Sequence, residues 1–446
     1  MRKFIYSALL FAALTVTSCD YHEFTVPNFA IEAEGFTSNA AIALTQDETV
    51  KLKVVVDNTT DYQVTWTMNK EVVSQEPTFN FTATQLGMNL VTATVTSPDG
   101  GVSSTMLQIN VQGKYKKGTF ILNEGNMTDG TGTLIFISPK GEITDSAYYR
   151  VNHTLLGNVA QDLFIANNKM YIVTQNGTAN GGEGLLIIAN AETLKKEAVF
   201  EAELKGIDWP SNVAVIGEQI YIRDLSGIHT FNATTKAITY VEGTKGATKN
   251  RMAVVANKVF APCGTNVLVL EEGKLTNKIK MPGQVSGILK ADKNSLWVSC
   301  TSKPAVICKV DATSNTIVET NDLGDAKVSQ GGWGDVAAPA ISAKGDTIYF
   351  SNHSTLIKRH IFSQKRTEDV VQVKNYVENA SMVYGNLAVD PVSGEVYITT
   401  IKGWGLDYLI NSIAVFDFDN TASPLKSDYK NYTKFPGGIY FTENFK

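Results

Sequence analysis

The stretch NVAVIGEQIYIRD, residues 212–224, contains two short apolar runs separated by a turn at Gly217. Such runs, bounded by turn residues, are typical of paired β-strands. The same plan, with an aromatic residue in the second strand, recurs in DLFIANNKMYIVTQ (162–175), RMAVVANKVFAPC (251–263), GILKADKNSLWVSC (287–300), PAISAKGDTIYFSN (339–352) and NLAVDPVSGEVYITT (386–400). Each pair is followed by a third apolar strand and a polar fourth strand. A repeated four-strand unit predicts a β-propeller with one blade per repeat.

Two incomplete units flank the six complete ones, which run from Gln161 to about Leu425. Residues 118–148 supply a second, third and fourth strand but no first strand, and GGIYFTENFK (437–446) supplies a first strand with nothing after it. Together they complete one blade. We therefore predict a seven-bladed β-propeller over residues 117–446, closed by the C-terminal strand, because closure removes the exposed sheet edges.

A separate small domain is predicted over residues 29–112. Turns separate the strands VKLKVVV (50–56), QVTWTM (63–68), FNFTA (79–83), LVTATVTS (90–97) and TMLQINV (105–111). Short strands at this spacing favour an Ig-like β-sandwich, with Trp66 in its core. No long amphipathic helix pattern is present, so the predicted fold class is all-β.

The first residues have the pattern of an export signal. Arg2 and Lys3 precede an apolar run from Phe4 to Val16 that is too short to span a bilayer, and small residues lead to Cys19. We interpret residues 1–18 as a lipoprotein signal peptide, Cys19 as the lipidated residue and 19–28 as a tether. The alternative is an ordinary signal peptide that happens to contain a cysteine.

Composition argues against some partners and some chemistry. A net charge of −5 argues against nucleic acid, which requires a basic surface. The spacing of Cys and His residues matches no metal site, and we expect no metal and no cofactor. Cys263, Cys300 and Cys308 are expected to be buried free thiols, although a bridge between Cys300 and Cys308 stays open.

In a four-stranded antiparallel blade, the loop after the second strand and the loop into the next blade lie on the same face. Aromatic side chains gather in these loops and offer rigid apolar area with polar edges, suited to a flat amphipathic ligand or a protein surface. The alternative for each is structural packing between blades. The candidate ligand-binding residues are Trp209, Trp333, Trp404, Tyr408, Tyr376, Tyr384, His153, His353 and Asp335.

Catalytic motifs are absent from the sequence, and we expect no enzyme activity. No nucleophile elbow, P-loop or His-Glu-x-x-His motif occurs. Asp208, Asp335 and Asp407 could act as general acids or bases, but Asp is a common turn former. A propeller hydrolase or lyase stays open as an alternative, because such enzymes can draw residues from separate blades without a linear motif.

The lipobox at Cys19, the YQVTWTMNKEVVS region and the blade segments IYIRDLSGIHTFNATT and VYITT…IAVFDFDNTAS resemble Gram-negative surface lipoproteins. These carry a PKD/Ig-like module and a YVTN/surface-layer-type propeller, and some capture cobalamin for a TonB-dependent outer-membrane receptor. The resemblance implies a lipid-anchored, surface-exposed outer-membrane protein that binds a small ligand, with cobalamin or a related corrinoid favoured. It matches no residue of a cobalamin site. A surface-layer or adhesion protein that binds a protein or glycan is the alternative.

Overall fold

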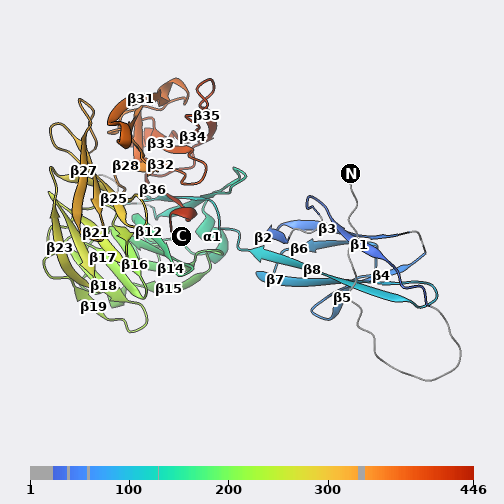
Figure 1. The fold of residues 1–446 in the computed structure, drawn as a ribbon. Helices are drawn as coiled ribbons and strands as arrows, with labels where there is room; N and C mark the ends of the chain where they lie inside the picture. The colour runs from blue at the N-terminus through green and yellow to red at the C-terminus, as the bar shows by residue number, and fades with distance from the viewer. Residues whose placement is uncertain (1–23, 38–40, 58–60, 129, 330–336, 446) are drawn as a thin grey trace. The chain divides into compact units, whose positions relative to one another are not determined.

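The computed structural model describes residues 24–37, 41–57, 61–128, 130–329 and 337–445. The chain divides into two compact units, with the boundary between Lys116 and Lys117. Almost all regular structure is strand, as predicted for an all-β chain (Figure 1).

The first unit contains two sheets. A three-stranded sheet has the order β1-β3-β6, and a five-stranded sheet has the order β2-β8-β7-β4-β5, in which β2 and β8 are parallel. The strands are β1 (Phe29–Ala33), β2 (Ile42–Thr45), β3 (Thr49–Val56), β4 (Gln63–Met68), β5 (Glu71–Ser74), β6 (Thr78–Thr82), β7 (Gly87–Thr96) and β8 (Val102–Gln112).

Both sheets of the first unit share one buried cluster, which contains Leu52 from β3 and Val91 from β7. Trp66 of β4 belongs to this cluster and is completely buried, as predicted. Its indole nitrogen donates a hydrogen bond of 2.9 Å to Glu76 O, so burial leaves no polar atom of the ring unsatisfied.

The second unit contains seven four-stranded antiparallel sheets within the described residues. The strands are β9 (Thr119–Asn123), β10 (Thr133–Ile137), β11 (Ile143–Thr144), β12 (Ala160–Ala166), β13 (Lys169–Thr174), β14 (Leu186–Asn190), β15 (Lys196–Phe200), β16 (Asn212–Ile216), β17 (Gln219–Arg223), β18 (Ile228–Asn232), β19 (Ile238–Tyr240), β20 (Ala253–Val255), β21 (Lys258–Cys263), β22 (Asn266–Glu271), β23 (Lys274–Lys280), β24 (Val285–Lys290), β25 (Ser295–Cys300), β26 (Val306–Asp311), β27 (Thr316–Asp322), β28 (Ile341–Lys344), β29 (Thr347–Phe350), β30 (Leu356–Ile361), β31 (Arg366–Gln372), β32 (Met382–Val389), β33 (Val396–Ile401), β34 (Asn411–Phe416), β35 (Leu425–Lys430) and β36 (Pro436–Phe441).

Short helices occupy some of the connections. They are α1 (Ala147–Asn152) and the 3₁₀ helices η1 (Ala179–Gly181), η2 (Ala202–Leu204), η3 (Phe362–Gln364), η4 (Val373–Asn375), η5 (Gly405–Leu409) and η6 (Thr442–Phe445). The helix α1 lies where the sequence pattern predicted the end of a fourth strand, so that the strand β11 has only two residues. The prediction of strand up to residue 148 was wrong there.

The sheets close into a circle. The first strand of each sheet contacts the first strand of the next, in the order β36, β12, β16, β20, β24, β28, β32 and back to β36. In Figure 1 the red strand β36 lies beside the green strand β12. The sheet that joins the two ends of the unit has the order β11-β10-β9-β36, with Ile439 opposite Ile121. The predicted pairing of the C-terminal strand with residues 118–148 is therefore confirmed.

Local sequence explains the tight hairpins between first and second strands. Asn167 and Asn168 both have positive φ, of 52° and 60°, as a two-residue hairpin turn with the right-handed twist of the strands requires. Within a sheet, inner strands are buried, as in β36, whereas the outer strand β23 is largely exposed. This gradient reproduces the apolar-to-polar order of strands in each repeat.

Candidate functional site

Loops at one end of the ring enclose a cavity of about 620 Å³ in the second unit. This volume lies within the range of about 300–1,000 Å³ that is typical of small-molecule sites. The lining residues are Glu124, Gly125, Asn126, Met127, Val159, Gln161, Gln175, Trp209, Ser211, Arg223, Leu225, Gly246, Ala247, Thr248, Lys249, Tyr384 and Phe435. All but Phe435 fall in the segments after second strands or between sheets in which sequence analysis placed the ligand face, although the structure places Gln161, Arg223 and Tyr384 in strands.

Arg223, the last residue of β17, reaches across the cavity wall to the loop before β20. Its Nε donates a hydrogen bond of 2.9 Å to Ala247 O, and its Nη1 donates one of 3.0 Å to Ser211 Oγ. Burial lowers the pKa of the Arg223 guanidinium, and the neighbouring Asp224 carboxylate opposes this change. Two neutral acceptors therefore hold a partly desolvated cation at the cavity wall.

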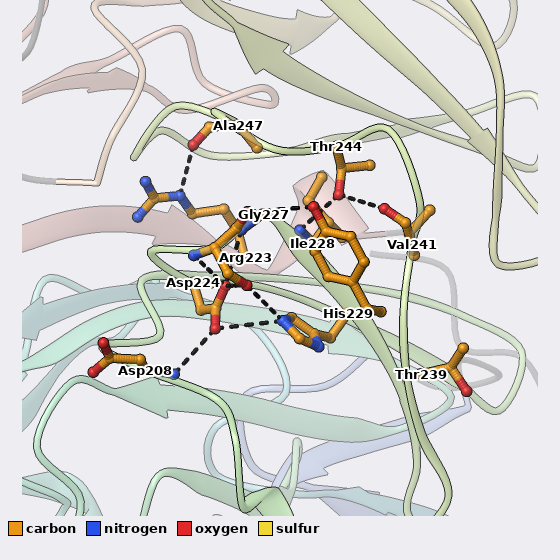
Figure 2. A network of polar contacts seen from close by, with 12 residues as sticks. Asp208, Arg223, Asp224, Gly227, Ile228, His229, Thr239, Val241, Thr244 and Ala247 are labelled. Atoms are coloured by element: carbon orange, nitrogen blue, oxygen red, sulfur yellow. Dashed lines mark hydrogen bonds and ion pairs between the residues drawn. The ribbon is translucent and has the colours of Figure 1, made fainter.

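Asp224 fixes the turn that follows Arg223 (Figure 2). Its Oδ2 accepts a hydrogen bond of 3.0 Å from the backbone N–H of Asp208, and its Oδ1 accepts one of 2.8 Å from the backbone N–H of Ser226. His229 Nε2 lies 3.4 Å from Asp224 Oδ2. Burial raises the pKa of Asp224, but the bonds from His229, Asp208 and Ser226 outweigh burial and hold the pKa well below its usual range. A rigid turn of this kind orients the Arg223 side chain.

Glu124, directly after β9, is the one carboxylate among the described residues that line the cavity. Its Oε1 accepts a hydrogen bond of 2.8 Å from Nε2 of the buried Gln161. Burial raises the pKa of Glu124 to about 7, although the charge of Lys249 and the bond from Gln161 oppose the shift. This carboxyl group can therefore gain or lose a proton near neutral pH.

An aromatic wall closes the side of the cavity formed by β32 and the chain before β36. The Tyr384 ring lies 5.7 Å from the Phe435 ring, centroid to centroid, and both line the cavity. Behind them, Trp404 packs edge-on to Tyr384 at 5.7 Å, and Tyr408 stacks on Phe435 at 4.1 Å. Trp209 adds a half-buried indole to the cavity lining.

Of the candidate residues, Trp209 and Tyr384 line the cavity, and Trp404 and Tyr408 adjoin it through the aromatic wall. Trp333, Asp335 and the lipidation residue Cys19 lie outside the described residues.

The structure does not bring three of the candidates to the cavity. Tyr376 packs edge-on to Phe416 at 6.1 Å, and His153 packs against Tyr149 beside α1. His353 is exposed and does not line the cavity; its carbonyl oxygen accepts a hydrogen bond from Val383 N. For these residues, loop position alone predicted a place at the cavity, and the side chains pack elsewhere.

Sequence reasoning overlooked the polar part of the cavity, namely Glu124, Gln161, Arg223 and Lys249. The loops that contain them were identified, but charged residues in loops are usually solvated and carry little information singly. One sequence pattern could have identified Arg223. Arg223 is the charged last residue of an otherwise apolar second strand, and the end of a second strand opens onto the loop face.

Within the part of the chain that the structure describes, no group of three or more His, Cys, Asp or Glu side chains could hold a metal ion. Over the same residues, no helix has both the length and the apolar character needed to cross a membrane.

The circular array of four-stranded sheets, with a cavity among the loops at one end, defines a β-propeller. The chain belongs to the family described as "Domain of unknown function (DUF5074)", whose model matches residues 117–442. No curated protein matches the sequence.

Solved structures agree with this fold. A quinonprotein alcohol dehydrogenase-like protein from Bacteroides thetaiotaomicron is 16% identical and has a TM-score of 0.57, covering 93% of this chain and 99% of that one. The WD40 β-propeller domain of Doa1 is 11% identical, covers 60% of this chain and 82% of its own, and has a TM-score of 0.40. The first likeness shows the fold alone, and the second is too slight to carry an argument.

Proposed function

We propose that this protein is a non-catalytic, lipid-anchored surface protein whose propeller cavity captures a small ligand for a TonB-dependent outer-membrane transporter. A corrinoid, with cobalamin as the leading example, is the favoured ligand. The observation that carries the proposal is the cavity of about 620 Å³, in which aromatic, amide and cationic side chains converge.

A corrinoid is a flat, amphipathic macrocycle with amide side chains, and cobalamin adds a phosphodiester. Trp209, Tyr384 and Phe435 offer apolar area for the ring. The amides of Gln175 and Asn126 can exchange hydrogen bonds with ligand amides. The macrocycle is larger than the cavity, so the proposal requires that only one side of the ligand be buried.

The remaining parts of the proposal concern how the propeller is displayed. We propose that the seven sheets are seven blades, that the first unit is a PKD/Ig-like spacer, and that Cys19 carries the lipid. Replacing Cys19 with Ser should then release the protein from the membrane fraction of the host cell. Unchanged fractionation of this variant would contradict the lipid anchor.

Calorimetric titration of the purified protein with cyanocobalamin and dicyanocobinamide tests the ligand. We expect stoichiometric binding of at least one of the two. Absence of binding would remove the corrinoid proposal. Turnover of glycans or lactones that is abolished in Glu124→Gln would instead indicate a lyase or hydrolase, because Glu124 is the cavity residue with the pKa of a general acid or base.

A second candidate function, adhesion to a protein, is favoured by one exposed loop. Trp404 and Leu406 at the start of η5 are 61% and 81% exposed, and Leu409 and Ile410 extend this apolar surface. Contiguous exposed apolar residues often mark protein contacts. Capture of the transporter alone, without any small ligand, would favour this candidate.

A further inference from the structure

The described lining of the cavity contains more positive than negative side chains. Its charged lining residues are Arg223, Lys249 and Glu124. The two cations come from the sheets of β17 and β20, whereas the aromatic pair Tyr384 and Phe435 faces in from β32 and the chain before β36. A ligand that fills the cavity therefore meets both cations and aromatic rings.

Arg223 retains donors that the protein does not use. The described residues supply two acceptors to its guanidinium, Ala247 O for Nε and Ser211 Oγ for Nη1. A guanidinium has five N–H donors, so the outer edge formed by Nη1 and Nη2 is left with three. In Figure 2 these two terminal nitrogens point away from the other labelled residues.

Arg223 also lacks a carboxylate partner. Its sequence neighbour Asp224 is occupied by the turn that it fixes and by His229, and no described carboxylate lies within ion-pair distance of the guanidinium. The charge of Asp224 acts on Arg223 without a direct ion pair, and burial still lowers the pKa of the guanidinium. A bound anion would relieve part of this cost of burial.

Lys249 brings a second positive charge to the same region. It lies two residues after Ala247, whose carbonyl oxygen is held by Arg223, and its side chain is half-buried in the cavity lining. Its charge also acts on Glu124. Among the described lining residues, Arg223 and Lys249 outnumber the one carboxylate, Glu124, so these side chains favour an anionic ligand.

We propose that Arg223 and Lys249 form an oxyanion subsite, which binds a phosphate ester or carboxylate of the ligand while the ligand's ring lies against the aromatic wall. The planar outer edge of Arg223 can receive two oxygens of one oxyanion, and Ser211 keeps this edge in place. This inference rests on the proposed function only in requiring that the cavity takes up a small ligand.

Phenyl phosphate, benzoate and benzyl alcohol are probes of matched ring size for this subsite. The test is their affinity for the full chain, measured by ligand-observed NMR at two salt concentrations. We expect at least one anion to bind about tenfold or more tightly than benzyl alcohol, and its affinity to fall as salt rises. The ratio of phenyl phosphate to benzoate affinity distinguishes phosphate from carboxylate. Equal binding of all three, or no binding of either anion at millimolar concentration, would overturn the proposal.

Variants locate the subsite. Arg223→Gln and Lys249→Gln should each weaken the tighter anion by about tenfold or more, with little effect on benzyl alcohol. Lys245→Gln is the matched control, because Lys245 is exposed in the same loop as Lys249 and does not line the cavity. An equal loss of anion affinity in Lys245→Gln, or no loss of anion affinity in Lys249→Gln, would refute the subsite. Should Arg223→Gln fail to fold, the result for Lys249→Gln is decisive.

Parallel titration with cyanocobalamin separates the two proposals. Anion binding that depends on Arg223, without binding of either cyanocobalamin or dicyanocobinamide, would keep the oxyanion subsite and remove the corrinoid. Binding of cyanocobalamin with no selectivity for the anionic probes would keep the corrinoid and remove the oxyanion subsite.

Discussion

The hydroxyl of Tyr440 donates a hydrogen bond of 2.8 Å to Asp162 Oδ1, although the two residues are 278 positions apart in the chain. The same oxygen accepts a bond of 3.2 Å from Arg251 Nε, and Asp162 Oδ2 accepts one of 3.2 Å from Val213 N. The Arg251 guanidinium also lies 4.0 Å from the centre of the Tyr440 ring. One buried carboxylate thus connects the C-terminal strand with three further sheets of the ring.

Replacing Tyr440 with Phe removes this hydrogen bond without changing the shape of the ring. Because Asp162 is buried and would lose one donor, we expect the free energy of unfolding to fall by about 1–3 kcal/mol. Urea unfolding followed by tryptophan fluorescence measures the change. Tyr376→Phe, at a site that is 45% exposed, is the control and should change little. Equal stability of Tyr440→Phe and wild type would contradict a role for this contact in closing the ring.

Removal of the residues after Lys434 deletes β36 and exposes the edge of β9. We expect this truncation to abolish cooperative unfolding of the whole second unit, because the deleted strand contacts both β32 and β12. Limited proteolysis and circular dichroism would report the loss. Deletion of Lys446 alone is the control. A truncated protein with native stability would contradict the closure of the ring by the C-terminal strand.

The repeat pattern predicted the sheets because inner strands must be apolar on both faces and turns need Asn, Asp or Gly. Asn190, at the end of a predicted third strand, accepts hydrogen bonds from the backbone N–H groups of Glu192 and Thr193, which explains why such units end in Asn or Asp. The short helix α1 escaped prediction, since six residues carry too little periodicity to distinguish helix from strand.

The loop face of the site was also predictable, but its chemistry was not. Glu124 and Lys249 lie 125 positions apart and reach one cavity only because the ring brings their sheets together. No local pattern marks such a pair. The candidate ligand-binding residues were predicted largely because they are aromatic and lie in loops. These two properties do not distinguish Trp209, which lines the cavity, from Tyr376, which packs on Phe416.

Ionisation of Glu124 should make stability depend on pH. Burial raises the pKa of Glu124 from 4.5 to about 7, with Lys249 and Gln161 opposing the shift. The pKa of Glu124 is higher in the folded protein than in the unfolded chain. The contribution of Glu124 to the free energy of unfolding is therefore complete below its unfolded-state pKa and is lost as the pH rises through about 7. A full shift of this size equals roughly 3 kcal/mol, which partial exposure of the side chain reduces to about 1–2 kcal/mol.

The variant Glu124→Gln cannot ionise and should lack this loss. We expect its free energy of unfolding, relative to wild type, to rise by about 1–2 kcal/mol between pH 4.5 and pH 8. Chemical denaturation at several pH values measures the difference. Glu242→Gln, at an exposed position outside the cavity lining, is the matched control variant. A constant difference for Glu124→Gln would contradict the raised pKa.

The three thiols of the described residues, Cys263, Cys300 and Cys308, are free, as expected, but Cys263 is only half-buried and the expectation of burial was wrong for it. Cys300 and Cys308 are completely buried, and the hydrogen bond that the Cys300 thiol donates to Cys308, together with burial, raises the pKa of Cys300. Since thiolates react and buried thiols do not, a maleimide should label Cys263 alone in the native protein and all three thiols in denaturant, as mapped by mass spectrometry. Native labelling of Cys300 as fast as that of Cys263 would contradict this packing.

Two tryptophans distinguish the cavity from the exposed loop beside it. Trp209 lines the cavity, whereas Trp404 is 61% exposed and lies behind Tyr384 at 5.7 Å. If the ligand lies in the cavity, Trp209→Ala should weaken binding of cyanocobalamin or of the tighter anionic probe by about 10- to 100-fold, and Trp404→Ala by less than about threefold. Calorimetry measures both, with thermal unfolding as the control for folding. A larger loss in Trp404→Ala would place the ligand over the loop from Trp404 to Ile410, because a side chain outside the cavity can matter more only if it makes the direct contact.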